Sequence, residues 1–259
     1  MSGYALDNSW EHANRRLALL ERILDPMTQH RITQLGVGQG ARCLEVGAGS
    51  GSIARWLCEH VAPTGSVVAT DINIALLDPI RLPNLEVLRH DILTSEPPGA
   101  PFDFVHSRWL LHHLREPEVA IRRMIDALRP GGWLLLEEVD FFPVHASSSA
   151  AFREFMVALV NTVVKPSGRD CFWARTLPET VAAMGLEELG GAGEFPVIQG
   201  GSPAAEFFAL TAVQMRDQLL AAGALAAPQL DEALQLLQSP DLWAFGGANI
   251  ALWGRRRAA

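Results

Sequence analysis

Residues 43–52 run Cys43-Leu44-Glu45-Val46-Gly47-Ala48-Gly49-Ser50-Gly51-Ser52 and carry the strongest structural signal in the chain. An apolar run typical of a buried strand ends in an acid and three alternating glycines, after which the pattern becomes helical. Glycine has no Cβ, so the backbone can pass close to a ligand, and the amides at a helix N-terminus favour a carboxylate or phosphate group. The stretch is therefore typical of a turn that binds a nucleotide cofactor.

Strand and helix patterns alternate on both sides of this turn. Strands are expected at 41–46, 66–71, 85–90, 102–107 and 133–139, and helices at 52–60, 73–79 and 116–128. One or two helices are expected between Trp10 and Leu35. After residue 140 we expect helices at 147–164, 178–184, 203–222 and 228–237 and strands at 186–197 and 249–254. Continued alternation predicts an α/β fold whose mostly parallel sheet carries helices on both faces.

Composition and charge favour a small-molecule partner over a nucleic acid. The 259 residues have a formal net charge of −8 and a single lysine, Lys165, whereas phosphate binding needs a clustered basic surface. The three cysteines, Cys43, Cys58 and Cys171, are far apart and form no C-x-x-C pair, which indicates neither a disulfide framework nor a zinc site. Without a signal-type leader or a run of about 18 apolar residues, the chain is predicted to be cytoplasmic and not membrane-bound.

The spacing of the glycines separates two kinds of cofactor turn. A dinucleotide turn requires G-x-G-x-x-G, but Ser52 stands where the third glycine would be, which disfavours a nicotinamide oxidoreductase. Gly47, Gly49 and Gly51, with Glu45 two residues before them, instead resemble motif I of class I S-adenosylmethionine-dependent methyltransferases.

The resemblance extends along residues 41–139 in the order that this family shows. Asp71 ends the second strand, where the family has an acid that holds both ribose hydroxyls. Asp91 follows the third strand and matches the acid beside the adenine, with Ile72 and Ile92 as apolar walls; the alternative is that Asp91 is an ordinary turn or capping residue. Residues 102–107 resemble the fourth strand, whose last residue is Ser107, and 128–133 resemble the turn before the fifth.

The resemblance implies a Rossmann-like class I methyltransferase sheet with helical lid and insertions, and S-adenosyl-L-methionine as the cofactor. It implies a cofactor site made of Glu45, Gly47, Gly49, Ser50, Gly51, Asp71, Ile72, Asp91 and Ile92. Ser107 is added because it ends the fourth strand, at the edge where ligands bind in open α/β sheets, so its backbone or hydroxyl is expected to touch the cofactor. The order of the expected elements predicts three parts: an N-terminal helical lid (1–40), the cofactor-binding core (41–140), and the rest of the same domain with acceptor-side helical insertions and final strands (141–259).

Two histidines after the fourth strand are candidates for acid/base chemistry. An imidazole can take a proton from a phenol, hydroxyl or ammonium group as methyl transfer proceeds. Similar small-molecule methyltransferases often have an acceptor-facing histidine there, so His112 is the first candidate and His113 the second; a packing or capping role is the alternative for either. No metal is expected, because the spacing of His106, His112 and His113 matches no zinc pattern.

These observations predict methyl transfer to an oxygen or nitrogen atom of a small-molecule metabolite in secondary metabolism. The alternative is a protein that binds S-adenosylmethionine and uses it structurally or to assist a rearrangement without methylation. The sequence does not determine the oligomeric state, and a homodimer stays open.

Overall fold

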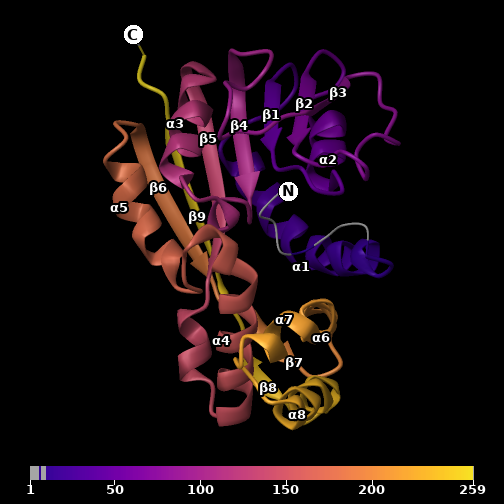
Figure 1. The fold of residues 1–259 in the computed structure, drawn as a ribbon. Helices are drawn as coiled ribbons and strands as arrows, with labels where there is room; N and C mark the ends of the chain where they lie inside the picture. Colours follow the sequence, from indigo (N-terminus) through magenta and orange to yellow (C-terminus); the bar gives the residue numbers. More distant parts are fainter. Residues whose placement is uncertain (1–5, 7–9, 259) are drawn as a thin grey trace. The chain divides into compact units, whose positions relative to one another are not determined.

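The computed structural model describes Leu6 and residues 10–258 (Figure 1). Its strands are β1 (Arg42–Val46), β2 (Ser66–Asp71), β3 (Leu85–Arg89), β4 (Phe102–Arg108), β5 (Leu128–Asp140), β6 (Glu187–Glu194), β7 (Val197–Gln199), β8 (Trp243–Phe245) and β9 (Ala248–Arg255). Its α-helices are α1 (Ala13–Gln34), α2 (Ser52–His60), α3 (Pro117–Asp126), α4 (Ala150–Val164), α5 (Leu177–Ala182), α6 (Pro203–Gln214), α7 (Arg216–Ala221) and α8 (Ala227–Gln238). Its 3₁₀ turns are η1 (Leu111–His113), η2 (Phe142–Ala146), η3 (Lys165–Ser167) and η4 (Trp173–Thr176).

The main sheet has seven strands in the order β3-β2-β1-β4-β5-β9-β6. The pairs β1–β2, β1–β4, β2–β3 and β4–β5 are parallel, so the predicted α/β fold with a mostly parallel sheet is confirmed. The strand order turns back between β1 and β4, and ligands of open α/β sheets bind at such a point, beyond the carboxyl ends of the strands. Val46 is in register with both Thr70 and Ser107, so the segments that follow β1, β2 and β4 begin at the same edge.

The chain forms two compact units. The first, here called the sheet unit, comprises residues 24–138, 176–192 and the described part of 251–259. The second, here called the helical unit, comprises the described part of 1–23 with residues 139–175 and 193–250. The functional boundaries expected from the sequence, at residues 40 and 140, stay predictions, and residues 1–5 and 7–9 of the expected lid lie outside the described residues.

The sheet unit has its core between α2 and the strands. Four residues of α2 are buried, Ile53, Ala54, Leu57 and Cys58, and their spacing places them on one face of the helix. This face contacts β1, β2 and β3, and Figure 1 shows the helix beside these strands. Because α2 begins directly after the glycines, packing of this face fixes where the glycine turn lies relative to the sheet edge.

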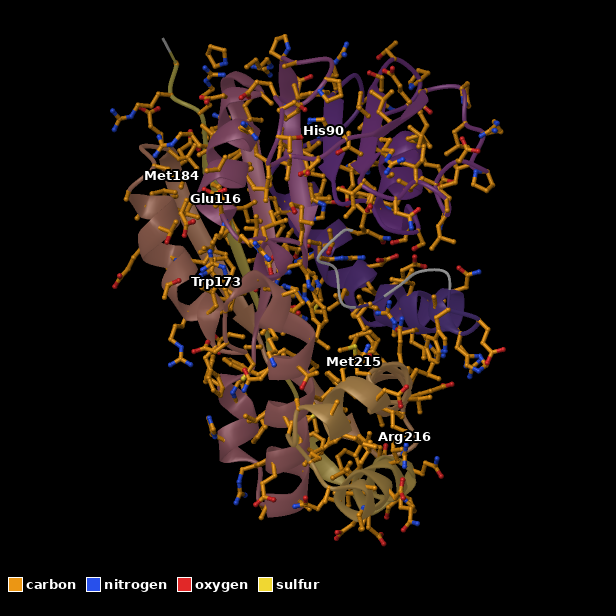
Figure 2. The ribbon with its side chains drawn as sticks, in the orientation of Figure 1. His90, Glu116, Trp173, Met184, Met215 and Arg216 are labelled. Carbon is orange, nitrogen blue, oxygen red and sulfur yellow. The ribbon has the colours of Figure 1, made fainter. Side chains whose placement is uncertain are left out.

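The helical unit is organised around α4. Its Ser149 side chain caps the helix by accepting a bond from Phe152 N at 3.2 Å, and buried aromatic and aliphatic residues follow along the helix. Helices α7 and α8 contact α4, while β7 and β8 form an antiparallel pair. The segment expected to be helical over 203–222 is divided into two helices, α6 and α7, which meet near Met215 and Arg216, labelled in Figure 2.

Two other expectations about local structure are wrong. The helix expected over 73–79 is a series of turns, because the Asp71 and Asn73 side chains accept bonds from backbone amides two residues ahead, at Asn73 and Ala75. The fifth strand, expected over 133–139, begins at Leu128. Its pairing with β4 jumps from Leu128 to Trp133, so the intervening Arg-Pro-Gly-Gly residues form an irregularity within the strand.

Candidate functional site

The glycine turn is held to the carboxyl end of β2. The amides of Gly47 and Ala48 both donate to Thr70 O, at 2.9 and 3.0 Å, and the Gly49 amide donates to Asp71 Oδ2 at 3.0 Å. Gly47, Gly49 and Gly51 have φ angles of 73°, 58° and 81°, which L residues with a Cβ rarely adopt. The turn therefore needs glycine at all three positions for backbone reasons.

The space around these glycines differs. A Cβ on Gly51 would lie 2.7 Å from Ile80 Cδ1 and 2.8 Å from Leu77 Cδ2, and one on Gly47 would lie 3.0 Å from Leu110 Cδ2. A Cβ on Gly49 would meet no atom of the described residues within 4 Å. The backbone of Gly49 thus borders open space, where a ligand can approach it closely.

A Gly49→Ala variant is expected to bind S-adenosylhomocysteine about tenfold or more weakly than the wild type. The added methyl group occupies the space beside the backbone, and the left-handed conformation costs roughly 1–2 kcal/mol of stability. Gly36→Ala is the matched control, because Gly36 has a φ of 73° and its Cβ would also meet no described atom within 4 Å. Calorimetry and urea unfolding should show a similar stability loss in both variants; an equal loss of affinity in both would contradict a ligand site at Gly49.

Asp71 provides a carboxylate beside this turn. Its Oδ2 accepts the Gly49 amide, and its Oδ1 accepts the Asn73 amide at 2.9 Å. Burial raises the pKa of Asp71, and the hydrogen bonds from backbone amides offset part of that rise. The Ile72 amide is a third backbone donor beside this carboxylate. Because a carboxylate has about four acceptor positions, Asp71 can still accept from a ribose hydroxyl.

The other predicted cofactor residues lie at the same edge in varied surroundings. Ser107 ends in a buried hydroxyl for which no hydrogen-bond partner exists among the described residues, as expected of a group that meets a ligand. Ile92 is buried, whereas Ile72 is 42% exposed and available as an apolar wall. Asp91 Oδ1 accepts the Leu93 amide at 2.9 Å, so Asp91 supports a turn whatever else it binds. Ser50 lies in the glycine turn itself.

Glu45 belongs to a buried ionic network that the sequence analysis did not predict. Its Oε2 lies 2.8 Å from His106 Nδ1, and the other ring nitrogen of His106 lies 3.1 Å from Glu137 Oε2. Thr28 and Arg31, both of α1, donate to Glu137 Oε2 and Oε1 respectively. Glu45, His106 and Glu137 are all at least 95% buried.

A second set of contacts links this network to the glycine turn. Arg108 donates to Thr28 Oγ1 at 2.9 Å and to Asp25 Oδ1 at 2.8 Å. The same Asp25 oxygen accepts a bond from Ser52 Oγ, at 3.1 Å, and Ser52 is the first residue of α2. The carboxyl-terminal half of α1 is thereby tied to β4, β5 and the helix that follows the glycines.

The electrostatics of the network are those of an imidazolium between two carboxylates. Burial alone would lower the pKa of His106, but Glu45 and Glu137 together raise it to about 9. Burial would likewise raise the pKa of Glu137, but the hydrogen bond and charge of His106 lower it to about 2. His106 is therefore charged at neutral pH and has no ring lone pair with which to act as a base.

His112 has a different environment. It lies in η1, and its Nδ1 is 2.6 Å from Glu138 Oε2; Glu138 is fully buried. The other oxygen of Glu138 accepts the amides of Leu110 and Leu111, at 2.9 and 2.6 Å. The ring centroid of His113 lies 4.0 Å from that of His112. Glu138 was not predicted as a site residue, although a pair of acids inside an apolar strand is a signal of buried polar contacts.

The segment that carries the histidines adjoins the glycine turn. Leu110 directly precedes η1, and its Cδ2 would lie 3.0 Å from a Cβ on Gly47, so the Leu110 side chain packs against the glycine turn. Trp109 has a φ of 52°, an unusual left-handed conformation for a bulky residue, which marks a sharp change of direction after β4. The predicted cofactor residues and His112 are thus brought to one edge of the sheet unit.

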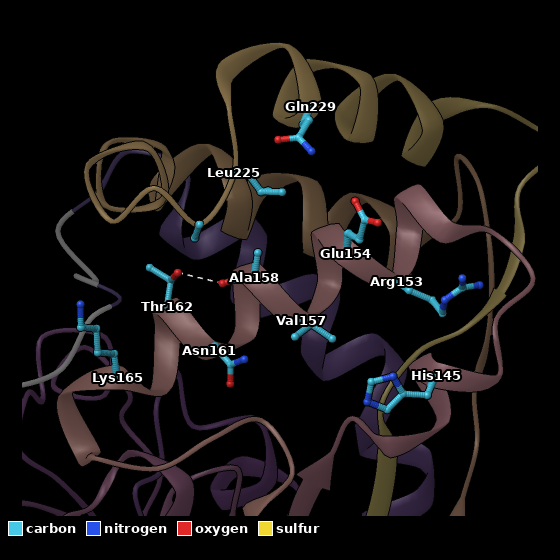
Figure 3. A pocket seen from close by; sticks show the side chains of 11 residues that line it. His145, Arg153, Glu154, Val157, Ala158, Asn161, Thr162, Lys165, Leu225 and Gln229 are labelled. Atoms are coloured by element: carbon cyan, nitrogen blue, oxygen red, sulfur yellow. Dashed lines mark hydrogen bonds between the residues drawn. The ribbon is translucent and has the colours of Figure 1, made fainter.

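The helical unit has a pocket of its own, with a volume of about 620 Å³ (Figure 3). It is lined by α4, by His145 of η2 and by residues before and within α8. Three of its polar side chains are engaged within the unit: Arg153 donates to Ser147 O, Thr162 donates to Ala158 O, and Asn161 accepts the Cys171 amide. These bonds are all made within the helical unit, and none of the pocket's lining residues is a predicted site residue.

The described residues hold neither a cluster of metal ligands nor a membrane-spanning helix. Among residues 10–258 and Leu6, no group of three or more His, Cys, Asp or Glu side chains could hold a metal ion. Within the same part of the chain, no helix has the length and apolar character needed to cross a bilayer.

Comparison with known proteins gives consistent matches. A family model described as a methyltransferase domain matches residues 10–176. Methyltransferase str2 of Strobilurus tenacellus is 31% identical over 164 residues, which cover 62% of this chain and 58% of that protein. The ubiquinone/menaquinone biosynthesis C-methyltransferase UbiE of Pseudomonas fluorescens (strain SBW25) is 32% identical over 154 residues, covering 56% of this chain and 60% of that protein. The chain thus spans about three fifths of the length of these two relatives.

A solved structure has a similar fold. Phosphoethanolamine N-methyltransferase 2 of Haemonchus contortus, in complex with phosphomonomethylethanolamine and S-adenosylhomocysteine, gives a TM-score of 0.55 at 18% identity. The match covers 94% of this chain and 52% of that one.

Proposed function

Because the chain belongs to the class I S-adenosylmethionine-dependent methyltransferases, we propose that it transfers a methyl group to an oxygen or nitrogen atom of a small-molecule metabolite of secondary metabolism. S-adenosyl-L-methionine is the cofactor of this family. The observation that carries the proposal is the meeting of two groups at one sheet edge: the glycine turn with Asp71, and the segment with His112.

The residues at this edge fit the cofactor. Asp71 would accept hydrogen bonds from the ribose hydroxyls of the cofactor. The amides and the open side of the glycine turn would face the amino acid part of the cofactor. The buried hydroxyl of Ser107 would gain the cofactor as a hydrogen-bond partner. Ile72 and Ile92 would flank the adenine, with Asp91 beside it. Glu45 stays in the predicted site, with one oxygen bonded to His106. When bound, the cofactor supplies an electrophilic methyl group on a sulfonium.

We propose that His112 is the general base, which removes a proton from the methyl acceptor. In-line transfer needs alignment and a deprotonated nucleophile. A base that accepts a phenol, hydroxyl or ammonium proton suits oxygen and nitrogen acceptors. The net charge of −8 and the single lysine support a small molecule rather than a nucleic acid.

Incubation of the purified chain with methyl-labelled S-adenosylmethionine and a metabolite extract tests the proposal. We expect label in a low-molecular-weight product, with an equal amount of S-adenosylhomocysteine released. Label found only in protein or RNA would contradict the small-molecule acceptor. Conversion of a metabolite without release of S-adenosylhomocysteine would instead support the use of the cofactor in a rearrangement without methylation.

Carbon is a second candidate for the acceptor atom. UbiE, which is 32% identical over the matched region, is named a C-methyltransferase. Removal of a phenol proton by His112 would also activate a ring carbon of a phenol, so the same base serves both reactions. The position of the label in the product, on a heteroatom or on carbon, decides between them.

A His112→Ala variant is expected to form product about 100-fold or more slowly, since a positioned general base typically contributes that much. Affinity for S-adenosylhomocysteine should stay within about threefold of the wild type, because the predicted cofactor contacts remain. His113→Ala is the matched control and should keep most of the rate. Full activity in the His112→Ala variant would remove His112 from the proposed reaction.

A further inference from the structure

We propose that Glu138 is a positioning residue that fixes His112 in the tautomer with hydrogen on Nδ1. Nε2 of His112 then carries the lone pair that removes a proton from the molecule to be methylated. This inference rests on the proposed function, since it describes how the proposed base is prepared. Glu138 is not proposed to touch the cofactor or the methyl acceptor; it acts on the ring of His112 and on the backbone that carries that ring.

The contacts of Glu138 leave one hydrogen-bonding pattern. An ionised carboxylate only accepts, and Oε2 lies 2.6 Å from His112 Nδ1, so Nδ1 is the donor. In a neutral imidazole the other nitrogen is then the acceptor. The amides of Leu110 and Leu111 hold Oε1 and prevent the carboxylate from turning away. The same residue therefore fixes the backbone of η1 and the ring of His112.

Glu137, the residue before Glu138, contacts a different histidine, His106, and leaves that ring without a lone pair. Glu137 and Glu138 are successive residues of a strand, so their side chains point to opposite faces. Both ring nitrogens of His106 face a carboxylate, Glu45 or Glu137, and both must donate. His112 faces one carboxylate, and its other close aromatic neighbours are His113 and Trp109. Glu137 thus helps to keep His106 a cation, whereas Glu138 leaves His112 one nitrogen that can act as a base.

Glu138→Gln tests this inference because it keeps the size of the side chain and changes its hydrogen bonding. The amide oxygen can still accept the Leu110 and Leu111 amides, but the amide NH₂ then faces His112 Nδ1 and favours hydrogen on Nε2. We expect ¹⁵N NMR to show the Nδ1–H tautomer of His112 in the wild type and the Nε2–H tautomer in Glu138→Gln. The His112→Ala variant identifies the signals of this ring.

Activity is measured with the same labelled cofactor and metabolite extract. We expect the initial rate of product formation to fall about 100-fold or more in Glu138→Gln, with the limb of the pH–rate profile that reports the base lost. Affinity for S-adenosylhomocysteine should be unchanged. Glu138→Asp, which keeps the charge, should recover part of the rate.

The outcomes separate the inference from the proposed function. An Nε2–H tautomer in the wild type, or an unchanged tautomer in Glu138→Gln, overturns the inference while methyl transfer can still be observed. A changed tautomer with an unchanged rate overturns it as well, because His112 would then not be the base. Absence of S-adenosylhomocysteine release by the wild type overturns the proposed function itself.

Discussion

A His106→Leu variant is expected to lose about 3 to 5 kcal/mol of unfolding free energy, which is a large part of the total for a protein of this size. His106 is fully buried between Glu45 and Glu137, at 2.8 and 3.1 Å. Leucine fills the space but leaves two buried carboxylates without their shared cation. Urea unfolding followed by circular dichroism measures the loss. A loss below about 1 kcal/mol would contradict a charged His106.

The pH dependence of stability tests the same network without relying on a large destabilisation. Because the pKa of His106 rises from 6.5 to about 9 on folding, its contribution is complete below about pH 6.5 and is lost as the pH rises through about 9. The pKa of Glu137 falls to about 2, so its contribution is present above about pH 4.5 and is lost towards pH 2. A neutral His106→Gln variant should lack the alkaline loss, while Arg31 and Arg108 stay charged throughout. The same alkaline slope in wild type and variant would contradict the assignment.

An Asp71→Ala variant is expected to bind S-adenosylhomocysteine at least about 100-fold more weakly. Each charge-assisted hydrogen bond contributes roughly 1.5 to 3 kcal/mol, and the carboxylate is proposed to accept two from the ribose. The variant also removes the acceptor of the Gly49 amide, so the glycine turn loses a support. Titration calorimetry measures the affinity, and urea unfolding measures any accompanying loss of stability.

Asp78→Ala is the matched control for this prediction. Asp78 is an exposed acid in the turns that follow β2, so its replacement changes the net charge equally. We expect its affinity to stay within about threefold of the wild type. Equal affinities of Asp71→Ala and the wild type would show that Asp71 does not hold the ribose.

The sheet around the glycine turn could be predicted because its signals are local. Apolar runs bounded by glycine and proline predict β1, β2 and β4 to within a residue or two, and the helical pattern after the glycines predicts α2. The family predicted from the glycine spacing and the later acids is confirmed by the matched model. The turns over 73–79 were missed because Asx side chains outweighed an apparently helical pattern. The strand β8 has only three residues, which are too few to show the alternation of apolar and polar side chains that marks a strand.

The partners of the candidate site residues could not be predicted in the same way. Glu138 and His112 are 26 residues apart, and Glu137 and Arg31 are 106 apart, so only the fold brings them together. A sequence shows that a charge lies in an apolar strand, but not which charge meets it. His112 was chosen as the first candidate base from the resemblance, and this assignment stays a prediction. The two carboxylates around His106 give a physical reason why the ring of His106 does not act as a base.

Titration of S-adenosylhomocysteine into the purified, folded wild-type protein is the decisive experiment for the cofactor site. We expect saturable binding of one molecule per chain, with loss of affinity in Gly49→Ala and Asp71→Ala and no binding of NAD under the same conditions. Folded protein that takes up neither S-adenosylhomocysteine nor S-adenosylmethionine, or that binds NAD instead, would contradict this expectation.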